Sequence, residues 1–333
     1  MTFLLIAAFL TGLSGGSANI SSYEVLRILT TILPGVEREG LEDPLLAHII
    51  INIRLPRVLL AIFVGASLAV AGAAFQGLLR NPLADPYTLG ASSGSAVGAV
   101  AVIYFGLTLP FLGMLTLPVI SIITGFVTLL FVLFFARAVQ RNLAAETIIL
   151  TGIIFSSFLG AIISLFIALS GDELRQLIYW LLGSVGMRGW SYVNIIAPFF
   201  FLGFTLMMIH WRELNAFVFG EQSAHHLGIN VERKKVIILF SASLLTGSAV
   251  AVSGTIGFVG LVIPHFVRLL WGSDHKHLIP LSAMAGGAFL VIADLISRTI
   301  IAPGELPVGV ITALVGAPVF GFILISKNRG KLS

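Results

Sequence analysis

The sequence predicts an all-α protein that crosses a membrane many times, with about ten transmembrane helices and an inverted internal repeat. Of its 333 residues, 57% are hydrophobic and only 10% are charged, whereas about 25% of the residues in an average soluble domain are charged. A second observation is a series of apolar runs near the length of roughly 20 residues that a helix needs to cross a bilayer. A third is a set of residues, including glycines and a proline, that match between the two halves of the chain at one fixed offset.

Ten apolar runs are candidate spans. The first is short, and no lysine or arginine precedes Arg27, so it lacks the basic start of a signal peptide. We expect a first membrane helix whose upstream part is missing from this start site; a cleaved signal peptide is the alternative. The eighth run is also short, and its glycines indicate a broken or half-depth helix. The runs lie near residues 1–13, 58–79, 87–109, 114–136, 147–169, 192–211, 236–253, 256–270, 279–297 and 307–325.

The charge distribution predicts the orientation of these spans. An even number of spans puts both termini on one side, and loops on the cytoplasmic side carry an excess of lysine and arginine. With both termini in the cytoplasm, twelve of the 19 basic residues lie inside and seven outside. The longest outer segment is 14–55. In it, Ser21-Ser22 followed by Glu24 predicts a capped amphipathic helix over Tyr23–Leu33, which ends at Pro34-Gly35 and lies on the membrane surface.

An offset of 182 residues aligns parts of the two halves of the chain. It pairs the second span with the seventh, which runs in the opposite direction, so the predicted halves, 54–190 and 233–326, form an inverted repeat. Such repeats are typical of transporters; chance similarity in glycine-rich apolar sequence is the alternative. The aligned pairs are Gly65 with Gly247, Ala69 with Ala251, Val70 with Val252, Gly72 with Gly254, Leu79 with Leu261, Pro82 with Pro264 and Gly90 with Gly272.

The segment 212–235 is the most polar part of the second half. Its spacing predicts two helical turns from Glu221 to Leu227, ended by Gly228, with Asn230 capping the next span. We interpret it as a short helix that contacts a cytoplasmic partner, where Ala224 and Gly228 permit close approach. An ordinary cytoplasmic loop is the alternative interpretation.

Charged residues at the outer ends of the spans form a second candidate site. Arg54 and Arg57 flank Pro56, which suits a first helical turn. Snorkelling explains many interfacial arginines, but positive charge on the outer side also suits an acidic soluble partner. Asp294 and Arg298 are spaced i,i+4, which predicts a structural ion pair rather than a proton relay.

Several classes of function are excluded or disfavoured. The absence of cysteine excludes thiol chemistry. A net charge of +4 without a basic stripe argues against nucleic-acid binding. The lysines do not fit a Walker A motif, so we expect no ATP, cofactor or metal on this chain. Gly90–Gly94 matches the G-x-S-x-G elbow of serine hydrolases, with Ser92 as nucleophile and His265 as base. The motif opens a helical span, however, which favours helix packing through Gly90, Gly94 and Gly98.

Several blocks of the sequence, in order, resemble the permease subunits of the FecCD type, the membrane components of ABC importers for ferric siderophores, haem and cobalamin. The likeness covers nearly the whole chain, and the NPLADP and GFVGLVIPH motifs are the most specific part. The blocks are RLPR at 54–57, AVAGAAFQGLLRNPLADPYTLG at 69–90, YWLLGSV at 179–185, GEQSAHHLG at 220–228, GTIGFVGLVIPHFVRLLWGSDHKHLIP at 254–280, ADLISR at 293–298 and ELPVGVITALVGAPVFGFIL at 305–324.

The resemblance implies a single permease domain over residues 1–333, like those of type II ABC importers, in the cell membrane of a prokaryote. It implies two ATPase subunits that bind ATP and Mg²⁺, an extracytoplasmic binding protein, and a second permease copy. We expect a homodimer; a heterodimer with a sister permease stays open. By the same analogy, Glu221, Ala224, Leu227 and Gly228 dock into the ATPase, and Arg54, Arg57 and Arg298 hold the binding protein.

A metal chelate is expected to follow a wide, weakly polar path through the membrane, surrounded by lipid. The predicted lining on the fifth span is polar but uncharged and consists of Thr151, Ser156, Ser157 and Ser164. Ferric siderophore and cobalamin are the leading candidates for the cargo, with haem as a third. The main alternative is an ion-coupled secondary transporter, which needs an ionisable group in the membrane, and Asp294 is the nearest candidate.

Overall fold

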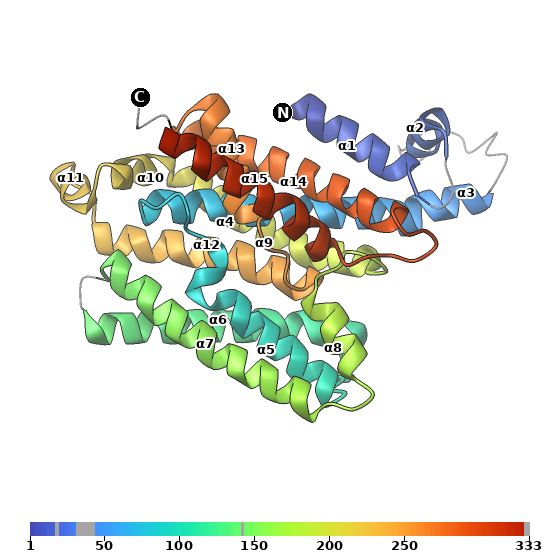
Figure 1. Ribbon diagram of the computed structural model, residues 1–333, viewed down its shortest axis with the longest axis horizontal. Coiled ribbons are helices and arrows are strands. Elements are labelled where there is room, and N and C mark those ends of the chain that lie inside the picture. Colours follow the sequence, from blue (N-terminus) through green and yellow to red (C-terminus); the bar gives the residue numbers. More distant parts are fainter. Residues whose placement is uncertain (17–19, 31–43, 141–142, 330–333) are drawn as a thin grey trace.

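The computed structural model describes residues 1–16, 20–30, 44–140 and 143–329, and helices are the only regular structure in these ranges (Figure 1). Apolar helices coincide in place with the ten predicted runs. They are α1 (Thr2–Ser14), α4 (Leu55–Leu78), α5 (Ala91–Tyr104), α6 (Thr116–Val139), α7 (Ala145–Leu169), α9 (Gly189–Ile209), α12 (Val231–Ser253), α13 (Val259–Trp271), α14 (His275–Thr299) and α15 (Val308–Arg329).

Among the described residues, six candidate spans are long and apolar enough to cross a membrane, and four shorter apolar helices accompany them. The shorter ones are α1, α5, α13 and the part of α15 from Val308 to Phe322. The all-α membrane class is therefore confirmed, and a count of ten spans stays a prediction. The remaining elements are α2 (Ser22–Thr30), α3 (Pro44–His48), η1 (Ile49–Arg54), η2 (Pro86–Leu89), η3 (Gly113–Leu115), α8 (Leu174–Leu181), α10 (Trp211–Val218) and α11 (Glu221–His226).

Helices α4 and α12 form the centre of the bundle. In each, 83% of the most apolar window is buried by the rest of the chain. They run in opposite directions (Figure 1); α4 packs against α13 and α14, while α12 packs against α5 and α6. The inverted repeat itself stays a prediction. At the offset of 182, Pro82 between α4 and η2 aligns with Pro264 inside α13, so that stretch pairs elements of different kinds.

Small residues let the central helices approach closely. A Cβ atom added at Gly65 would overlap the carbonyl oxygen of Gly286 on α14, and one added at Gly72 would overlap that of Gly260 on α13. On α5, Gly94 and Gly98 lie in the same way against threonines of α6. Membrane helices associate through such small-residue contacts because lipid provides little hydrophobic drive between them. The packing interpretation is confirmed for Gly94 and Gly98, whereas Gly90 precedes α5 and makes only ordinary contacts.

The chain is not helical between α12 and α13; this break includes Gly257 of the eighth predicted run, whereas α13 is a short helix that continues through Gly260. Residues 254–258 are not helical, with φ of +74° at Gly254 and +69° at Phe258. The Tyr87 hydroxyl accepts a hydrogen bond from the Ile256 N–H (2.8 Å) and donates one to the Ile256 carbonyl (3.0 Å). Non-helical backbone inside a membrane protein requires such internal partners.

Helix α2 begins with the predicted cap. The Ser21 hydroxyl accepts a hydrogen bond from the Glu24 N–H at 3.2 Å, and the Glu24 carboxylate accepts one from the Ser21 N–H at 3.2 Å. This is a capping box. The predicted end of this helix at Pro34-Gly35 lies outside the described residues.

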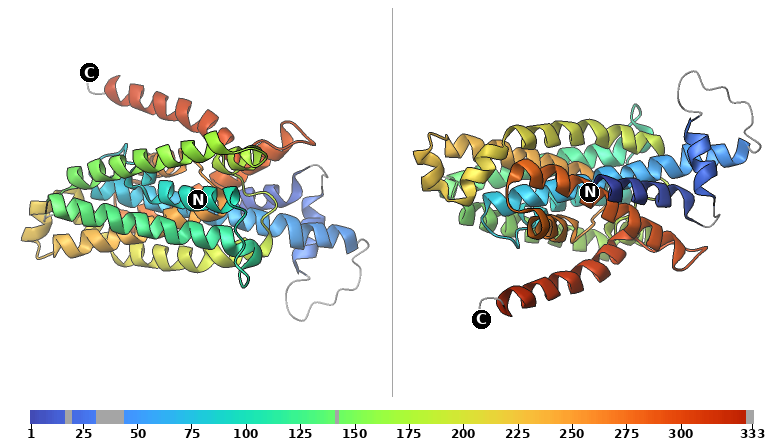
Figure 2. Two further views of the ribbon diagram at one scale, coloured as in Figure 1. Left: turned by 90° about the horizontal axis from the view of Figure 1, so that it is seen from below. Right: turned by 90° about the horizontal axis from the view of Figure 1, so that it is seen from above.

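The two ends of the bundle carry different features (Figure 1). One, called here the α11 end, contains α10, α11, the start of α12 and the connection from α6 to α7. The opposite one, called the arginine end, contains Arg54, Arg57 and Arg298 together with α2 and α3. Helix α7 borders the bundle, and α15 leaves it toward its C-terminal end in both views of Figure 2.

Candidate functional site

Helix α11 has the predicted local structure. It follows Gly220, whose φ is +106°, and it is followed by Gly228, whose φ is +79°. Both values lie in the left-handed region that glycine adopts without steric cost. The Asn230 side chain then accepts a hydrogen bond from the Arg233 N–H at 3.1 Å and caps α12. The two turns, the glycine stop and the asparagine cap are confirmed.

The four predicted coupling residues occupy different environments. Ala224 is fully buried in the chain and anchors α11, while Glu221 is half-buried. Leu227 is 71% exposed, and Gly228 has open space beside it. A groove of about 650 Å³ lies between α11 and α12; its lining residues are Glu221, Gln222, His225, Gly228, Ile229, Asn230, Val231 and Glu232. The outward surface of α11 is thus centred on Leu227 and Gly228, and the docking role itself stays a prediction.

Helix α10, which was not predicted from the sequence, packs directly against α11. The Glu213 carboxylate lies 2.6 Å from the Lys234 ammonium of α12, and the Asn215 amide donates to Asp274 at 2.7 Å, before α14. The hydrogen bond from Asn215 holds the pKa of the Asp274 carboxyl below its usual range. Helix α10 is therefore joined to two membrane helices, while Phe219 beside it is 77% exposed.

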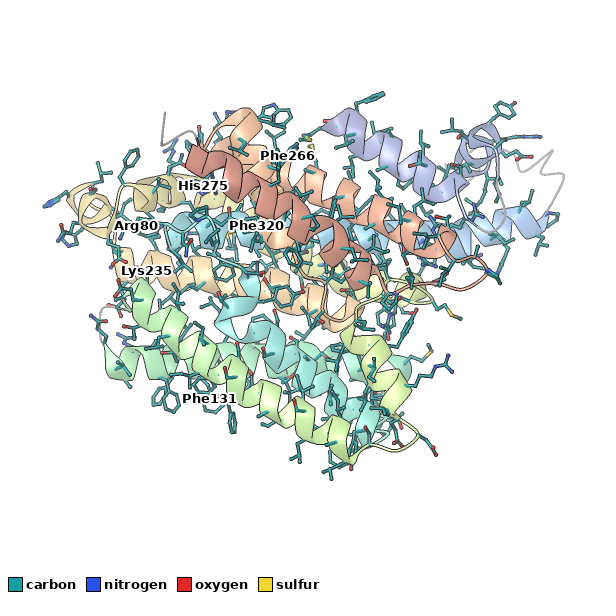
Figure 3. The ribbon with its side chains drawn as sticks, viewed as in Figure 1. Arg80, Phe131, Lys235, Phe266, His275 and Phe320 are labelled. Atoms are coloured by element: carbon teal, nitrogen blue, oxygen red, sulfur yellow. The ribbon has the colours of Figure 1, made fainter. Side chains whose placement is uncertain are left out.

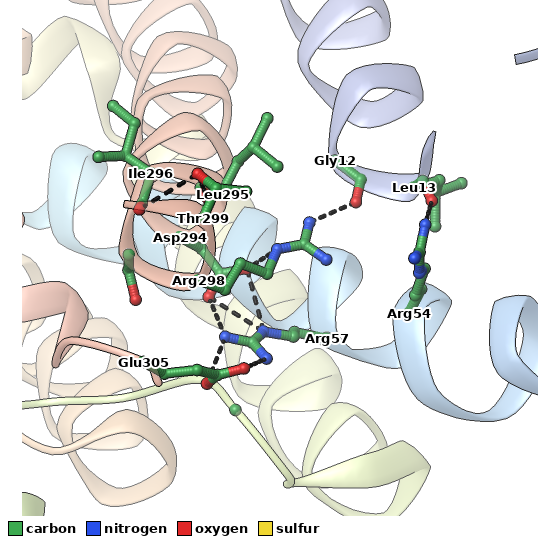
Figure 4. A network of polar contacts seen from close by, with 12 residues as sticks. Gly12, Leu13, Arg54, Arg57, Asp294, Leu295, Ile296, Arg298, Thr299 and Glu305 are labelled. Atoms are coloured by element: carbon green, nitrogen blue, oxygen red, sulfur yellow. Dashed lines mark hydrogen bonds and ion pairs between the residues drawn. The ribbon is translucent and has the colours of Figure 1, made fainter. Parts of the chain in front are cut away.

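The arginine end contains a buried ion network that joins three segments (Figure 4). Arg57 on α4 donates to Asp294 on α14, with distances of 2.9 Å from Nη2 and 3.1 Å from Nε. The same guanidinium donates to Glu305, in the α14–α15 connection, at 2.8 Å and 3.0 Å. Asp294 is only 1% exposed. A planar guanidinium suits such a double bidentate arrangement.

The other two arginines hold the C-terminus of α1. Arg54 donates to the carbonyl oxygens of Leu13 (2.7 Å) and Ser14 (2.9 Å), and Arg298 donates to that of Gly12. The last carbonyls of a helix lack partners within the helix and carry a partial negative charge, so cations are favoured there. Arg54 and Arg298 are 6% and 8% exposed.

The predicted ion pair between Asp294 and Arg298 is present, with Nε 3.6 Å from Oδ2. Its sequence spacing is correct, but Arg57 is the closer partner of Asp294. Three arginines and two carboxylates leave this cluster with a net charge of +1. The predicted docking arginines are thus brought together, but each has a partner inside the chain, and their role in docking stays a prediction. The hydrogen bond from Arg57 keeps the pKa of Glu305 below its usual range.

The predicted path residues lie on α7, where only 6% of the most apolar window is buried. The Thr151 hydroxyl donates to the Thr147 carbonyl of its own helix at 2.8 Å, and Ser164 donates to Gly160 at 3.0 Å. Thr151 is buried and Ser156 is half-buried, while Ser157 and Ser164 are exposed. The polar residues therefore lie on a helix at the edge of the subunit. Their part in a path stays a prediction.

Two alternative functions lack support. Ser92 is a buried residue in the first turn of α5, not in a strand–turn–helix elbow, and its hydroxyl has no hydrogen-bond partner among the described residues. Residues Gly90–Gly94 therefore lack the strand–turn–helix setting that a serine hydrolase elbow requires. Asp294, the candidate for ion coupling, is held by Arg57 and Arg298. No feature of the described chain favours ion-coupled transport.

Known proteins similar to this chain are membrane transport proteins. The model of the FecCD transport family matches residues 4–326. An uncharacterized ABC transporter permease protein of Bacillus subtilis, YvrB, is 58% identical and covers 99% of this chain and 93% of its own length. The cobalamin import system permease protein BtuC of Halobacterium salinarum is 42% identical (86% of this chain, 76% of its own). The hemin transport system permease protein HmuU of Yersinia pestis is 41% identical (85% and 84%).

A solved structure has the same fold. It is described as an inward-facing conformation of a metal-chelate type ABC transporter, and it superposes with a TM-score of 0.85 at 31% sequence identity. The match covers 98% of this chain and 97% of the other. The likeness therefore extends from α1 through α15.

Proposed function

The chain belongs to the FecCD transport family and is a multi-pass permease of the ABC transporter class, and from this premise we propose that it imports a metal chelate with energy from a partner's ATP hydrolysis. The cargo we propose is a ferric siderophore or cobalamin, with haem as a third candidate. Relatives whose names specify cobalamin and hemin support this class of cargo. The membrane is the cell membrane of a prokaryote, and both termini face the cytoplasm.

The observation that carries this proposal is α11. It stands on α10 at one end of the bundle, its base is fixed by Ala224, and its surface at Leu227 and Gly228 is open. Exposed apolar side chains on a short, well-anchored helix are suited to a protein partner. We propose that two ATPase subunits, which bind ATP and Mg²⁺, receive this helix from each of two permease copies.

The arginine end is the proposed contact for the substrate-binding protein. Its net charge of +1 favours an acidic partner, although Arg54 and Arg298 already bind the end of α1. We therefore assign Arg57 the more direct role, because its partner Glu305 is partly exposed and Arg57 can exchange this carboxylate for one of the binding protein. This pair is closer to solvent than the pair of Arg57 with Asp294, so its exchange costs less.

Two copies are proposed because the exposed serines of the predicted path, Ser157 and Ser164, lie at the edge of the subunit, whereas Thr151 is buried inside it. A path lined by Ser157 and Ser164 needs a second wall, and a second copy provides one by symmetry. A homodimer is the simplest arrangement. Helix α15, which stands away from the bundle (Figure 2), offers additional surface for the same contact.

The test is ATPase activity and co-purification of the full chain with its cognate ATPase subunit, with Gly228→Arg compared against Gly228→Asn. Both variants place a side chain at a φ of +79°, but asparagine tolerates this region and is small. We expect Gly228→Arg to lose assembly and ATPase activity and Gly228→Asn to keep most of both. If Gly228→Arg assembles and hydrolyses ATP normally, α11 is not the docking helix.

A further inference from the structure

Lys235 is the most deeply buried lysine or arginine among the described residues of the α11 end (Figure 3). It lies in the second turn of α12, and its side chain is only 1% exposed. Its Nζ lies 2.6 Å from Glu221 Oε1, at the start of α11, and donates to the Leu143 carbonyl oxygen at 2.9 Å. A buried ammonium is unfavourable unless it is paired and hydrogen-bonded, so both contacts are needed to hold it there.

The second contact is with the connection between α6 and α7. Leu143 has a φ of +49° and is 2% exposed. Leucine rarely adopts this left-handed conformation, which the surroundings must therefore maintain. Its side chain belongs to the same buried cluster as Ala224 of α11 and Ile148 of α7. The residue just before α7 is thus joined to α11 through one shared ammonium group.

Other ion pairs at this end join different segments. Lys234, the preceding residue, pairs with Glu213 of α10. Arg137 near the end of α6 pairs with Glu232 of α12 at 2.9 Å, and these two side chains are 66% and 44% exposed. Such an exposed pair contributes little. The Lys235 ammonium differs because it is buried and because its two partners belong to α11 and to the α6–α7 connection.

We propose that Lys235 is a positioning residue that transmits movement of α11 to the start of α7. This inference rests on the proposed function, in which an ATPase subunit moves α11. If Glu221 moved alone, the buried Lys235 ammonium would lose its only carboxylate partner in the described chain, which is unfavourable. Lys235 and the Leu143 carbonyl group therefore move with Glu221. Helix α7, which begins two residues later at Ala145, carries the polar residues of the proposed path.

The variant that tests this is Lys235→Met, which removes the charge and both polar contacts while keeping much of the side-chain volume. The remaining Glu221 is about one-third exposed and can be hydrated, so the fold should persist. Glu221→Gln is the second variant, because it removes the charge of the partly exposed partner and leaves Lys235 in place. Arg137→Gln is the matched control, since it removes an ion pair between α6 and α12 that does not involve α11.

The experiment uses the full chain in complex with its cognate ATPase subunit in lipid nanodiscs. Deuterium uptake is measured over residues 221–228 and 143–149, with and without a non-hydrolysable ATP analogue, and ATPase activity is recorded in parallel. In wild type and Arg137→Gln, we expect the nucleotide to change uptake in both segments. In Lys235→Met, we expect the change to persist at 221–228 and to fall about tenfold at 143–149, as loss of one charge-assisted hydrogen bond predicts. Glu221→Gln should show a smaller loss at 143–149.

The outcomes separate this inference from the proposed function. If wild type does not assemble with the ATPase subunit, the proposed function fails and the inference falls with it. If wild type responds at 221–228 but not at 143–149, or if Lys235→Met and Glu221→Gln respond like wild type in both segments, the proposed function stands and the inference is overturned. A merely structural role would lower thermal stability without separating the two segments.

Discussion

Arg57 and Asp294 form a buried ion pair between α4 and α14, with Nη2 2.9 Å from Oδ1 and side chains that are 11% and 1% exposed. The same guanidinium holds Glu305, whose side chain is 35% exposed. One arginine therefore has a carboxylate partner in the interior and another near the surface. Because desolvation differs so much between the two carboxylates, their removal should have unequal consequences.

Asp294→Asn should destabilise the protein far more than Glu305→Gln. Removal of one partner from a buried ion pair typically costs about 3 kcal/mol or more, because the remaining charge is left uncompensated, whereas a partly exposed pair contributes less than about 1 kcal/mol. Thermal unfolding of both variants in the same detergent measures this difference. An ion-coupled carrier predicts instead that Asp294→Asn abolishes uptake at unchanged stability, and that result would argue against a structural pair.

The contribution of Glu305 should depend on pH. Its pKa in the folded protein lies below the ordinary value of 4.5, chiefly because of the hydrogen bond from Arg57. A lowered carboxyl pKa gives stability that is present above the unfolded-state value and is lost as the pH falls through the folded-state value. The melting temperatures of wild type and Glu305→Gln, measured from about pH 7 down to about pH 3, should therefore differ most at neutral pH and converge in acid. A gap that stays constant over this range would contradict the assignment.

Local features of the chain were predictable from the sequence. The apolar runs mark the main helices because burial in lipid requires continuous apolar surface, and Gly228 and Asn230 mark the end of α11 and the start of α12 because their backbone and side-chain preferences act locally. Helices α8 and α10 were missed, since an amphipathic helix of eight residues is too short for a periodic signal.

Pairings between distant residues were not predictable. Arg57 and Asp294 are 237 positions apart, and the local spacing of Asp294 and Arg298 suggested a different closest partner. Lys235 follows Arg233 and Lys234, a run that usually indicates a solvated surface. In the fold, however, its ammonium lies between the Glu221 carboxylate and the Leu143 carbonyl oxygen. These contacts arise from the tertiary arrangement, which hydrophobic periodicity does not specify.

The proposed second copy can be tested by crosslinking, because the chain contains no cysteine. A single cysteine at Ser164, exposed on α7, should link two copies through a short bis-maleimide reagent if the exposed serines of α7 border a shared path. Ile6→Cys is the control, since Ile6 is 53% exposed on α1, away from α7 in Figure 1. Equal crosslinking at both positions would indicate random collisions in the membrane, and crosslinking at Ile6 alone would place the partner elsewhere.

Close packing of the central helices gives a prediction with an internal control. A methyl group at Gly72 of α4 would overlap the main-chain oxygen of Gly260 on α13, whereas nothing lies within 4 Å of the corresponding position at Gly160 on α7. Both glycines are inside long helices, where alanine is favoured by about 1 kcal/mol. Gly160→Ala should therefore be neutral or slightly stabilising.

Gly72→Ala should lower stability by about 1–3 kcal/mol or prevent correct assembly, because a backbone oxygen cannot rotate away as a side chain can. The difference between the two variants, measured by thermal unfolding, isolates the contact of α4 with α13 from helix propensity. If the two variants unfold at the same temperature, α4 and α13 are further apart than the structure places them. The Tyr87–Ile256 hydrogen bonds, which fix the break just before α13, would then have to be reconsidered as well.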